Sequence, residues 1–124
     1  IQIIGCLPTN APVMYESIKA GKIIDVPELP TLSDGTAGGI DHDTITFDLC
    51  RDLIDDYVLT TEEEILSAMR FVLKHHHHVI EGSAGVSVAA ILKQKEKFKG
   101  KKVAAVICGS NVSEAVLKRV VCDV

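Results

Sequence analysis

Short apolar runs alternate along this chain with longer segments in which apolar residues recur every three or four positions. The apolar runs predict buried strands over residues 1–6, 57–59 and 103–107. The longer segments predict helices over residues 11–20, 44–53, 60–74 and 86–98, and a last helix from residue 113. Strands that alternate with helices are typical of an α/β fold: a three-layer arrangement with an open, mostly parallel sheet and helices on both faces.

The final predicted strand, Val103–Ile107, ends abruptly in small and polar residues. Cys108, Gly109, Ser110 and Asn111 have the chemistry of a turn, and the next helix begins just beyond them. Ligands of open α/β sheets bind outside the carboxyl ends of the strands. The pattern therefore predicts a binding site here, but it does not identify a substrate.

Residues 22–43 form a long stretch without helical or strand periodicity. It contains two prolines and, between residues 35 and 39, three glycines. A loop of this length inside one domain is usually functional or disordered, and closely spaced glycines permit close backbone approach. We interpret it as an ordered loop that covers or lines a site; a plain surface connection is the alternative.

Several helix ends are marked by capping residues. Asn10 is the expected N-cap of the first helix, and Gly21 its stop. The third helix opens with capping-box spacing in two registers, Thr60 with Glu63 or Thr61 with Glu64.

Four consecutive histidines, His75–His78, follow the third helix. A metal site and an affinity tag are both conceivable. The run is internal and short, and neighbouring residues of a helix point about 100° apart, so at most two of the four share a face. We interpret the run as a polar helix end and predict no metal site.

The totals limit the functional class. With 124 residues, 47% hydrophobic composition and a net charge of −4, the chain fits one domain and does not favour nucleic-acid binding. No apolar run is long enough for a membrane span, and no signal peptide is evident. The four cysteines lack metal-site or disulfide spacing, which favours a reducing, cytoplasmic setting. They are Cys6, Cys50, Cys108 and Cys122.

Two further features complete the reading from the residues. The chain begins within an apolar run and without methionine, so we expect residues 1–124 to be a single α/β domain that is the carboxyl-terminal fragment of a larger catalytic domain. Glu81 is a lone acid in front of a strongly apolar helix. It is either the cap of that helix or a group near a cofactor.

Six short motifs, in this order and spacing, resemble the carboxyl-terminal part of the large domain of serine/threonine dehydratases. These are pyridoxal-phosphate (PLP) enzymes of fold type II, the tryptophan-synthase β-like fold, and serine racemase is a relative. The motifs are Gly5–Ala11, Leu32–Gly35, Leu53–Asp56, Glu62–Ile65, Glu81–Val86 and Cys108–Val112.

The resemblance implies roles for the turn after the last predicted strand. Cys108 would offer its thiol to the pyridine nitrogen of PLP, a weaker anchor than a carboxylate and one suited to β-elimination. Gly109 would let the backbone pass close to the ring, and Asn111 would fix the turn. Ser110 stands where a second glycine is commoner in the family.

The resemblance also implies roles outside that turn. Glu81 would lie near the cofactor ring, and Asp34 and Gly35 would face the substrate, a small hydroxy amino acid. Leu7 and Val13 stand where the racemase-like members have acids that bind a divalent cation, so we predict no such metal.

The family's Schiff-base lysine and glycine-rich phosphate loop would precede Ile1, so we expect the chain alone to be inactive and the whole enzyme to be a homodimer. Two other functions stay open. One is a stand-alone, non-enzymatic α/β module that binds a ligand or partner, and the other is a metal-binding domain that uses the histidines.

Overall fold

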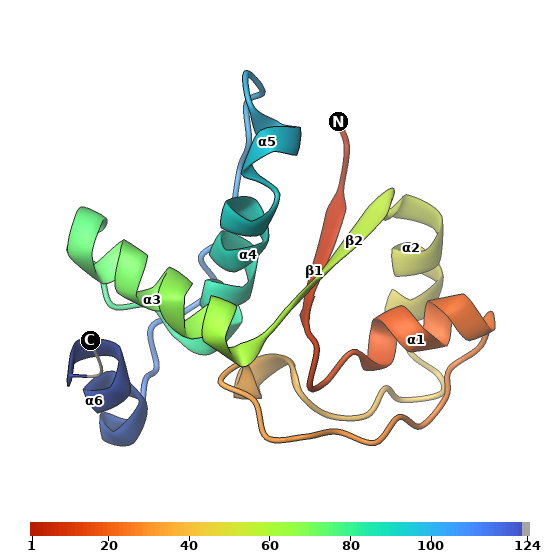
Figure 1. Ribbon diagram of the computed structural model, residues 1–124. Helices are drawn as coiled ribbons and strands as arrows, with labels where there is room; N and C mark the ends of the chain where they lie inside the picture. Colours follow the sequence, from red (N-terminus) through yellow and green to blue (C-terminus); the bar gives the residue numbers. More distant parts are fainter. Residues whose placement is uncertain (123–124) are drawn as a thin grey trace.

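The computed structural model describes residues 1–122 as an α/β arrangement built on a small parallel sheet (Figure 1). Its two strands pair in parallel, with Ile4 opposite Asp56 and Pro8 opposite Thr60. The elements in chain order are β1 (Ile4–Pro8), α1 (Val13–Ala20), the 3-10 turn η1 (Asp34–Thr36), α2 (Thr46–Leu53), β2 (Asp56–Thr60), α3 (Glu62–His76), α4 (Gly82–Lys93), α5 (Lys95–Phe98) and α6 (Glu114–Cys122).

Helices cover the sheet from two sides. On one side, the Tyr57 ring of β2 lies 5.4 Å from the Tyr15 ring of α1, and its hydroxyl donates to the Cys50 carbonyl of α2. On the other side, α4 packs against both strands, and Figure 1 shows α3 beyond it. The expected fold class, with parallel strands between helical layers, is confirmed.

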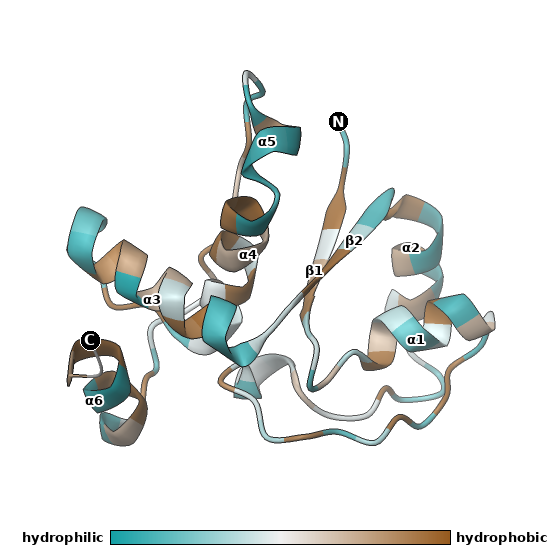
Figure 2. Ribbon diagram, in the orientation of Figure 1, coloured by the Kyte–Doolittle hydropathy of each residue, from teal (hydrophilic) through white to brown (hydrophobic). Residues whose placement is uncertain are grey.

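The core lies mainly between α3 and α4. Ile65, Met69 and Ala84 are almost completely buried there, and Val120 of α6 joins them. Gly85 permits the close approach, because a Cβ on it would lie 3.0 Å from the Met69 side chain. Figure 2 shows the corresponding contrast: α4 is mostly hydrophobic, and α5 is mostly hydrophilic. Among residues 1–122, no helix has both the length and the apolar character that a membrane crossing requires.

The strand expected at Val103–Ile107 is absent from the sheet. The segment is extended but pairs with neither strand, and Val106 is 75% exposed. The prediction of a buried strand is therefore wrong for the described chain. An apolar run forms a strand only where another strand supplies hydrogen bonds, and nothing in residues 1–122 lies in that position.

Several element boundaries also differ from expectation. The helix expected over residues 86–98 begins earlier, at Gly82, and is broken at Gln94 into α4 and α5. Asn10 is not the cap of α1, because its side-chain amide donates to the Pro30 carbonyl, 2.6 Å away. Gly21 ends α1 in the left-handed conformation (φ 71°), as expected.

Two predictions about α3 are confirmed. Its amino end has the full capping box of Thr61 and Glu64, which decides between the two registers. Its carboxyl end lies within the histidine run: His76 is the last helical residue, and His77 caps the helix in the left-handed conformation.

Candidate functional site

Glu81 holds the turn that follows the unpaired segment. Its backbone N–H donates to the Gly109 carbonyl (3.1 Å), and its carboxylate accepts from the Asn111 backbone N–H (3.1 Å). A Cβ on Gly109 would lie 2.5 Å from that carboxylate. Gly109 is thus required for the close contact, and Glu81 fixes the turn from both its backbone and its side chain.

Glu81 occupies the N-cap position of α4, but its side chain makes no capping hydrogen bond. The sequence left open whether Glu81 caps α4 or lies near a cofactor. Glu81 does stand at the cap position, but its carboxylate does not bond to the helix. It spans from the helix start to the turn at residues 109–111.

The loop with Asp34 and Gly35 lies against the same end of α4. A Cβ on Gly35 would lie 2.8 Å from the Ser83 hydroxyl and 3.8 Å from the Glu81 carboxylate. Gly82 is equally confined, because a Cβ on it would collide with the Leu32 carbonyl. The fold therefore brings residues 32–35, 81–83 and 109–111 together, and we call these ten residues the α4 junction.

Two polar groups of this junction differ in their surroundings. The Asp34 carboxylate is exposed and accepts from the Gly35 backbone N–H (2.9 Å). The Ser83 hydroxyl is buried and has no hydrogen-bond partner among the described residues. The sequence patterns did not single out Ser83; its place between Gly82 and Gly85 in the first turn of α4 is the signal that could have drawn attention to it.

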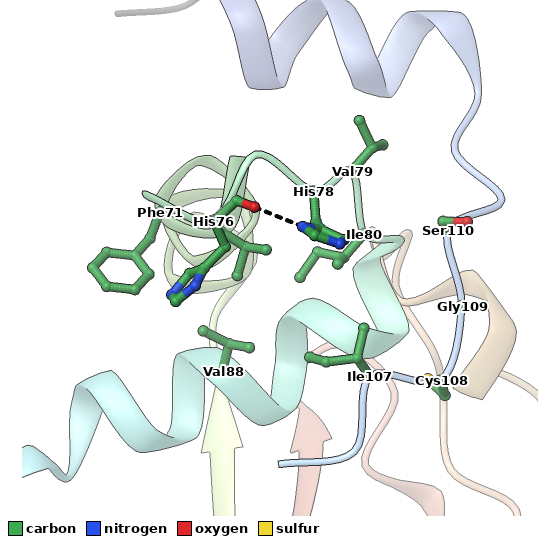
Figure 3. A pocket seen from close by; sticks show the side chains of 11 residues that line it. Phe71, His76, His78, Val79, Ile80, Val88, Ile107, Cys108, Gly109 and Ser110 are labelled. Carbon is green, nitrogen blue, oxygen red and sulfur yellow. Dashed lines mark hydrogen bonds between the residues drawn. The ribbon is translucent and has the colours of Figure 1, made fainter. Parts of the chain in front are cut away.

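Cys108 precedes the junction and is exposed. Together with Gly109 and Ser110 it lines a pocket of 640 Å³ between the carboxyl end of α3 and the end of the unpaired segment at Ile107. Figure 3 shows Phe71 and His76 on one wall and Val88 and Ile107 below them. The thiol is thus accessible, as a group that binds a ligand must be.

The pocket is largely apolar, and sequence analysis did not anticipate it. His78 turns its Nδ1 to the His76 carbonyl (2.6 Å), so these two histidines form one side of the opening (Figure 3). The lining residues among the described chain include neither Glu81 nor a lysine. The pocket therefore adjoins the turn at residues 108–110 without including the rest of the α4 junction.

Cys6 and the two positions at which racemase-like members of the family have metal-binding acids lie outside the α4 junction. Burial raises the pKa of the Cys6 thiol, which lies in β1. Leu7 is half-buried, and Val13 is buried at the start of α1. Within residues 1–122, no group of three or more histidine, cysteine, aspartate or glutamate side chains is placed to hold a metal ion.

Comparison with protein families gives a match over most of the chain. A family model described as "Pyridoxal-phosphate dependent enzyme" matches residues 1–109. The chain is 38% identical over 121 residues to the L-threonine ammonia-lyase of Thermotoga maritima, an alignment that covers 98% of this chain and 30% of that protein. The chain thus spans about a third of the length of this relative.

Solved structures agree in fold. The processed form of threonine deaminase isoform 2 from Solanum lycopersicum superposes with a TM-score of 0.85 at 29% identity, over 96% of this chain and 33% of that chain. Maize serine racemase superposes with a TM-score of 0.83 at 28% identity, over 94% of this chain and 36% of that chain.

Proposed function

Because the chain belongs to the pyridoxal-phosphate-dependent enzyme family, we propose that residues 1–124 supply one side of the PLP site of a threonine or serine dehydratase. Such an enzyme eliminates the β-hydroxyl of a hydroxy amino acid and releases ammonia and a 2-oxo acid. The observation that supports the proposal most directly is the α4 junction, in which Glu81, Gly109 and Gly35 meet beside the accessible Cys108.

The residues at the junction fit the pyridine ring of PLP. Gly35 and Gly109 let the backbone of the junction lie close to Ser83 and Glu81, where a Cβ would collide. The Ser83 hydroxyl is a buried polar group without a hydrogen-bond partner among the described residues, and the exposed Cys108 is a second polar side chain next to the junction. The phosphate does not fit here, because the junction offers a carboxylate and no basic side chain.

PLP supplies an electron sink for bonds at the α-carbon of the amino acid. Within this chain, we assign to Cys108 the contact with the ring nitrogen. A thiol holds a proton at that nitrogen less firmly than a carboxylate would, which suits elimination of an activated leaving group. Glu81 holds the backbone of Gly109 and Asn111 in place beside the ring. We assign to Asp34 a position that faces the substrate.

The proton-transferring lysine of the family has no counterpart at the junction. The described lysines with ion-pair partners are engaged elsewhere: Lys19 pairs with Glu16, Lys93 binds Glu64 and the Leu59 carbonyl, and Lys97 pairs with Asp56. We therefore propose that residues 1–124 alone, supplied with PLP, form no 2-oxo acid from L-threonine or L-serine. The homodimer and the cytoplasmic setting stay predictions.

A domain exchange tests the function. Residues 1–124 replace the matching region of the Thermotoga maritima L-threonine ammonia-lyase, and 2-oxo acid release is measured with L-threonine, L-serine and PLP. We expect activity from the exchanged protein. We expect Cys108→Ala to lower kcat by about tenfold, the effect of one lost hydrogen bond in the reacting complex.

The exposed Cys122 provides a matched control, because Cys122→Ala removes a thiol that lies in α6. Equal activity of the Cys108→Ala and Cys122→Ala proteins would contradict the role of Cys108. A folded, PLP-loaded exchange protein that converts L-serine to D-serine and releases no 2-oxo acid would favour racemisation, the reaction named in the maize structure.

A further inference from the structure

β2 forms the outer edge of the sheet, because among residues 1–122 it pairs with β1 on one side and with no strand on the other. Successive residues of a strand turn their backbone groups alternately toward the neighbouring strand and away from it. The Thr9 N–H donates to the Thr60 carbonyl (2.8 Å), so Thr60 faces β1. By the same alternation, Tyr57 and Leu59 turn their N–H and carbonyl groups outward, away from β1.

Side chains occupy the first and the last of these outward groups. The Tyr57 N–H donates to the Asp56 carboxylate (2.8 Å), and that carboxylate also pairs with Lys97 of α5. The Leu59 carbonyl accepts from the ammonium group of Lys93 in α4 (2.9 Å). The Tyr57 carbonyl and the Leu59 N–H stand between these two contacts. We call Asp56, Lys93 and Lys97 the edge caps.

The edge caps are themselves held by ion pairs. Lys93 binds the Glu64 carboxylate of α3 (2.9 Å), which also belongs to the capping box of that helix. The hydrogen bond from Lys97, together with the one from the Tyr57 N–H, lowers the pKa of Asp56. The Asp56 carboxylate therefore stays ionised at neutral pH, and both contacts with the edge persist there.

Nothing else in β2 prevents another strand from adding to it. Backbone groups at a free edge are a template for pairing with a further chain, and charged side chains, lysine above all, are a common means of blocking it. The strand Asp56–Thr60 contains neither proline nor glycine, and its centre is Tyr57, Val58 and Leu59, residue types that favour strands or pack well in them. Blocking of this edge therefore depends on the edge caps.

We propose that the edge caps keep β2 closed to strand addition, and that their removal lets a second copy of this chain pair antiparallel with β2 about a two-fold axis at Val58. In that arrangement Tyr57 of one copy lies opposite Leu59 of the other, and each N–H meets a carbonyl. A second copy therefore satisfies all the outward groups of both strands. The inference goes beyond the proposed function and requires neither PLP nor turnover.

A double substitution that leaves the net charge unchanged tests the proposal. Asp56→Ala frees the Tyr57 N–H, and Lys93→Met frees the Leu59 carbonyl while it keeps most of the apolar length of the lysine. The reporter is hydrogen exchange of the Leu59 amide, followed by NMR over a wide range of chain concentration, with sedimentation equilibrium on the same samples.

The parent and the variant should differ in how this amide responds to concentration. In the parent we expect exchange of the Leu59 amide to be independent of chain concentration. In the doubly substituted chain we expect it to slow by about tenfold as the concentration rises, while the measured mass approaches that of a dimer.

Asp43→Ala with Lys95→Met provides the matched control. It makes the same two exchanges at exposed residues outside the edge caps, so the net charge is again unchanged, and we expect it to behave as the parent does. Circular dichroism shows whether each variant is folded. Should the double variant not fold, Lys93→Met alone carries the test, with a smaller slowing of the Leu59 amide that still depends on concentration.

Three results would overturn the proposal. The first is a Leu59 amide that exchanges as fast in the folded variant as in the parent at every concentration. The second is an equal slowing in the control variant. The third is a slowing at Leu59 without any rise in mass, which would mean that a segment of the same chain covers the edge.

Discussion

Gly109 and Glu81 form the closest contact of the α4 junction. A methyl group on Gly109 would lie 2.5 Å from the Glu81 carboxylate, closer than real Cβ atoms approach. Neither group has room to move freely, because Glu81 also bonds to Asn111. Glycine is thus required at position 109 by a contact with Glu81, which lies 28 positions earlier in the sequence.

Gly109→Ala should therefore displace the turn at residues 109–111. We expect a loss of about 1–3 kcal/mol in the free energy of unfolding, the usual cost of an added methyl in a packed site, and a changed rate of Cys108 alkylation. Urea denaturation and thiol titration measure the two effects.

Gly39→Ala is the control, because a Cβ on Gly39 meets open space, and it should change neither quantity. A Gly109→Ala chain as stable as the parent, with the same thiol reactivity, would show that Glu81 does not confine the turn.

The sequence predicted the residues of the junction better than their contacts. Glu81, Gly109 and Asn111 were selected through motif resemblance, and the structure brings them together. Whether they bind PLP stays a prediction. Ser83 and the pocket walls at Phe71 and His76 were missed, since burial without a partner and a cavity between helices depend on packing that no local pattern encodes.

Among the elements, α3 shows how local chemistry can decide a boundary. Thr61 and Glu64 satisfy each other's backbone N–H groups, and Lys93 of α4 pairs with the same carboxylate (2.9 Å). Burial raises the pKa of Glu64, but the hydrogen bond from the Thr61 backbone N–H and the charge of Lys93 together lower it by more. The pKa of Glu64 therefore lies below its ordinary value. The cap thereby joins α3 to α4.

This cap predicts a dependence of stability on pH. A carboxylate with a lowered pKa stabilises the fold fully above its unfolded pKa, and the contribution disappears as the pH falls through its folded pKa. Glu64→Gln should therefore reduce the melting temperature at pH 7, and the difference from the parent should shrink as the pH is lowered below about 4.

Glu63→Gln, in the same turn but without an ion pair among the described residues, is the matched control and should show a smaller difference. Thermal denaturation at a series of pH values measures both. A Glu64→Gln difference that stays constant down to the acid range would contradict the coupling.

Element prediction succeeded where the signal was local and failed where it was not. The α3 cap and the Gly21 stop of α1 depend on residues within one turn of the chain. Val103–Ile107 has the composition of a strand, but strand formation needs a partner, and the apolar pattern does not say whether one is present. The break at Gln94 had no proline or glycine to mark it.

At the scale of the whole molecule, the described chain combines a closed part and an open part. Ile65 and Ala84 are fully buried between α3 and α4, whereas Val106 and Ile107 are at least half exposed. Ion pairs between Lys93 and Glu64 and between Lys97 and Asp56 connect α4 to α3 and α5 to β2. Backbone stability should follow the same division.

Hydrogen exchange of the chain alone should resolve this division. We expect amides of Leu66–Met69 in α3 to exchange about a hundredfold more slowly, relative to random coil, than amides of Val103–Ile107, because the former open only with the core. Mass spectrometry of proteolytic fragments is sufficient to measure it. Equal protection of the two segments would mean that residues 103–107 are already paired in solution.

The α4 junction has a consequence for how such a chain can diverge. Gly35, Gly82 and Gly109 come from three distant parts of the sequence, and each is denied a side chain by neighbours within or beside the same helix start. Enlarging Gly35 or Gly109 alone produces a collision with the Ser83 or Glu81 side chain, so descendants tolerate a change there only when a second substitution arrives with it, whereas Gly82 faces the Leu32 backbone, which no substitution removes. Paired replacements at these positions would be the historical trace of that restriction, while the outer faces of the helices drift one residue at a time.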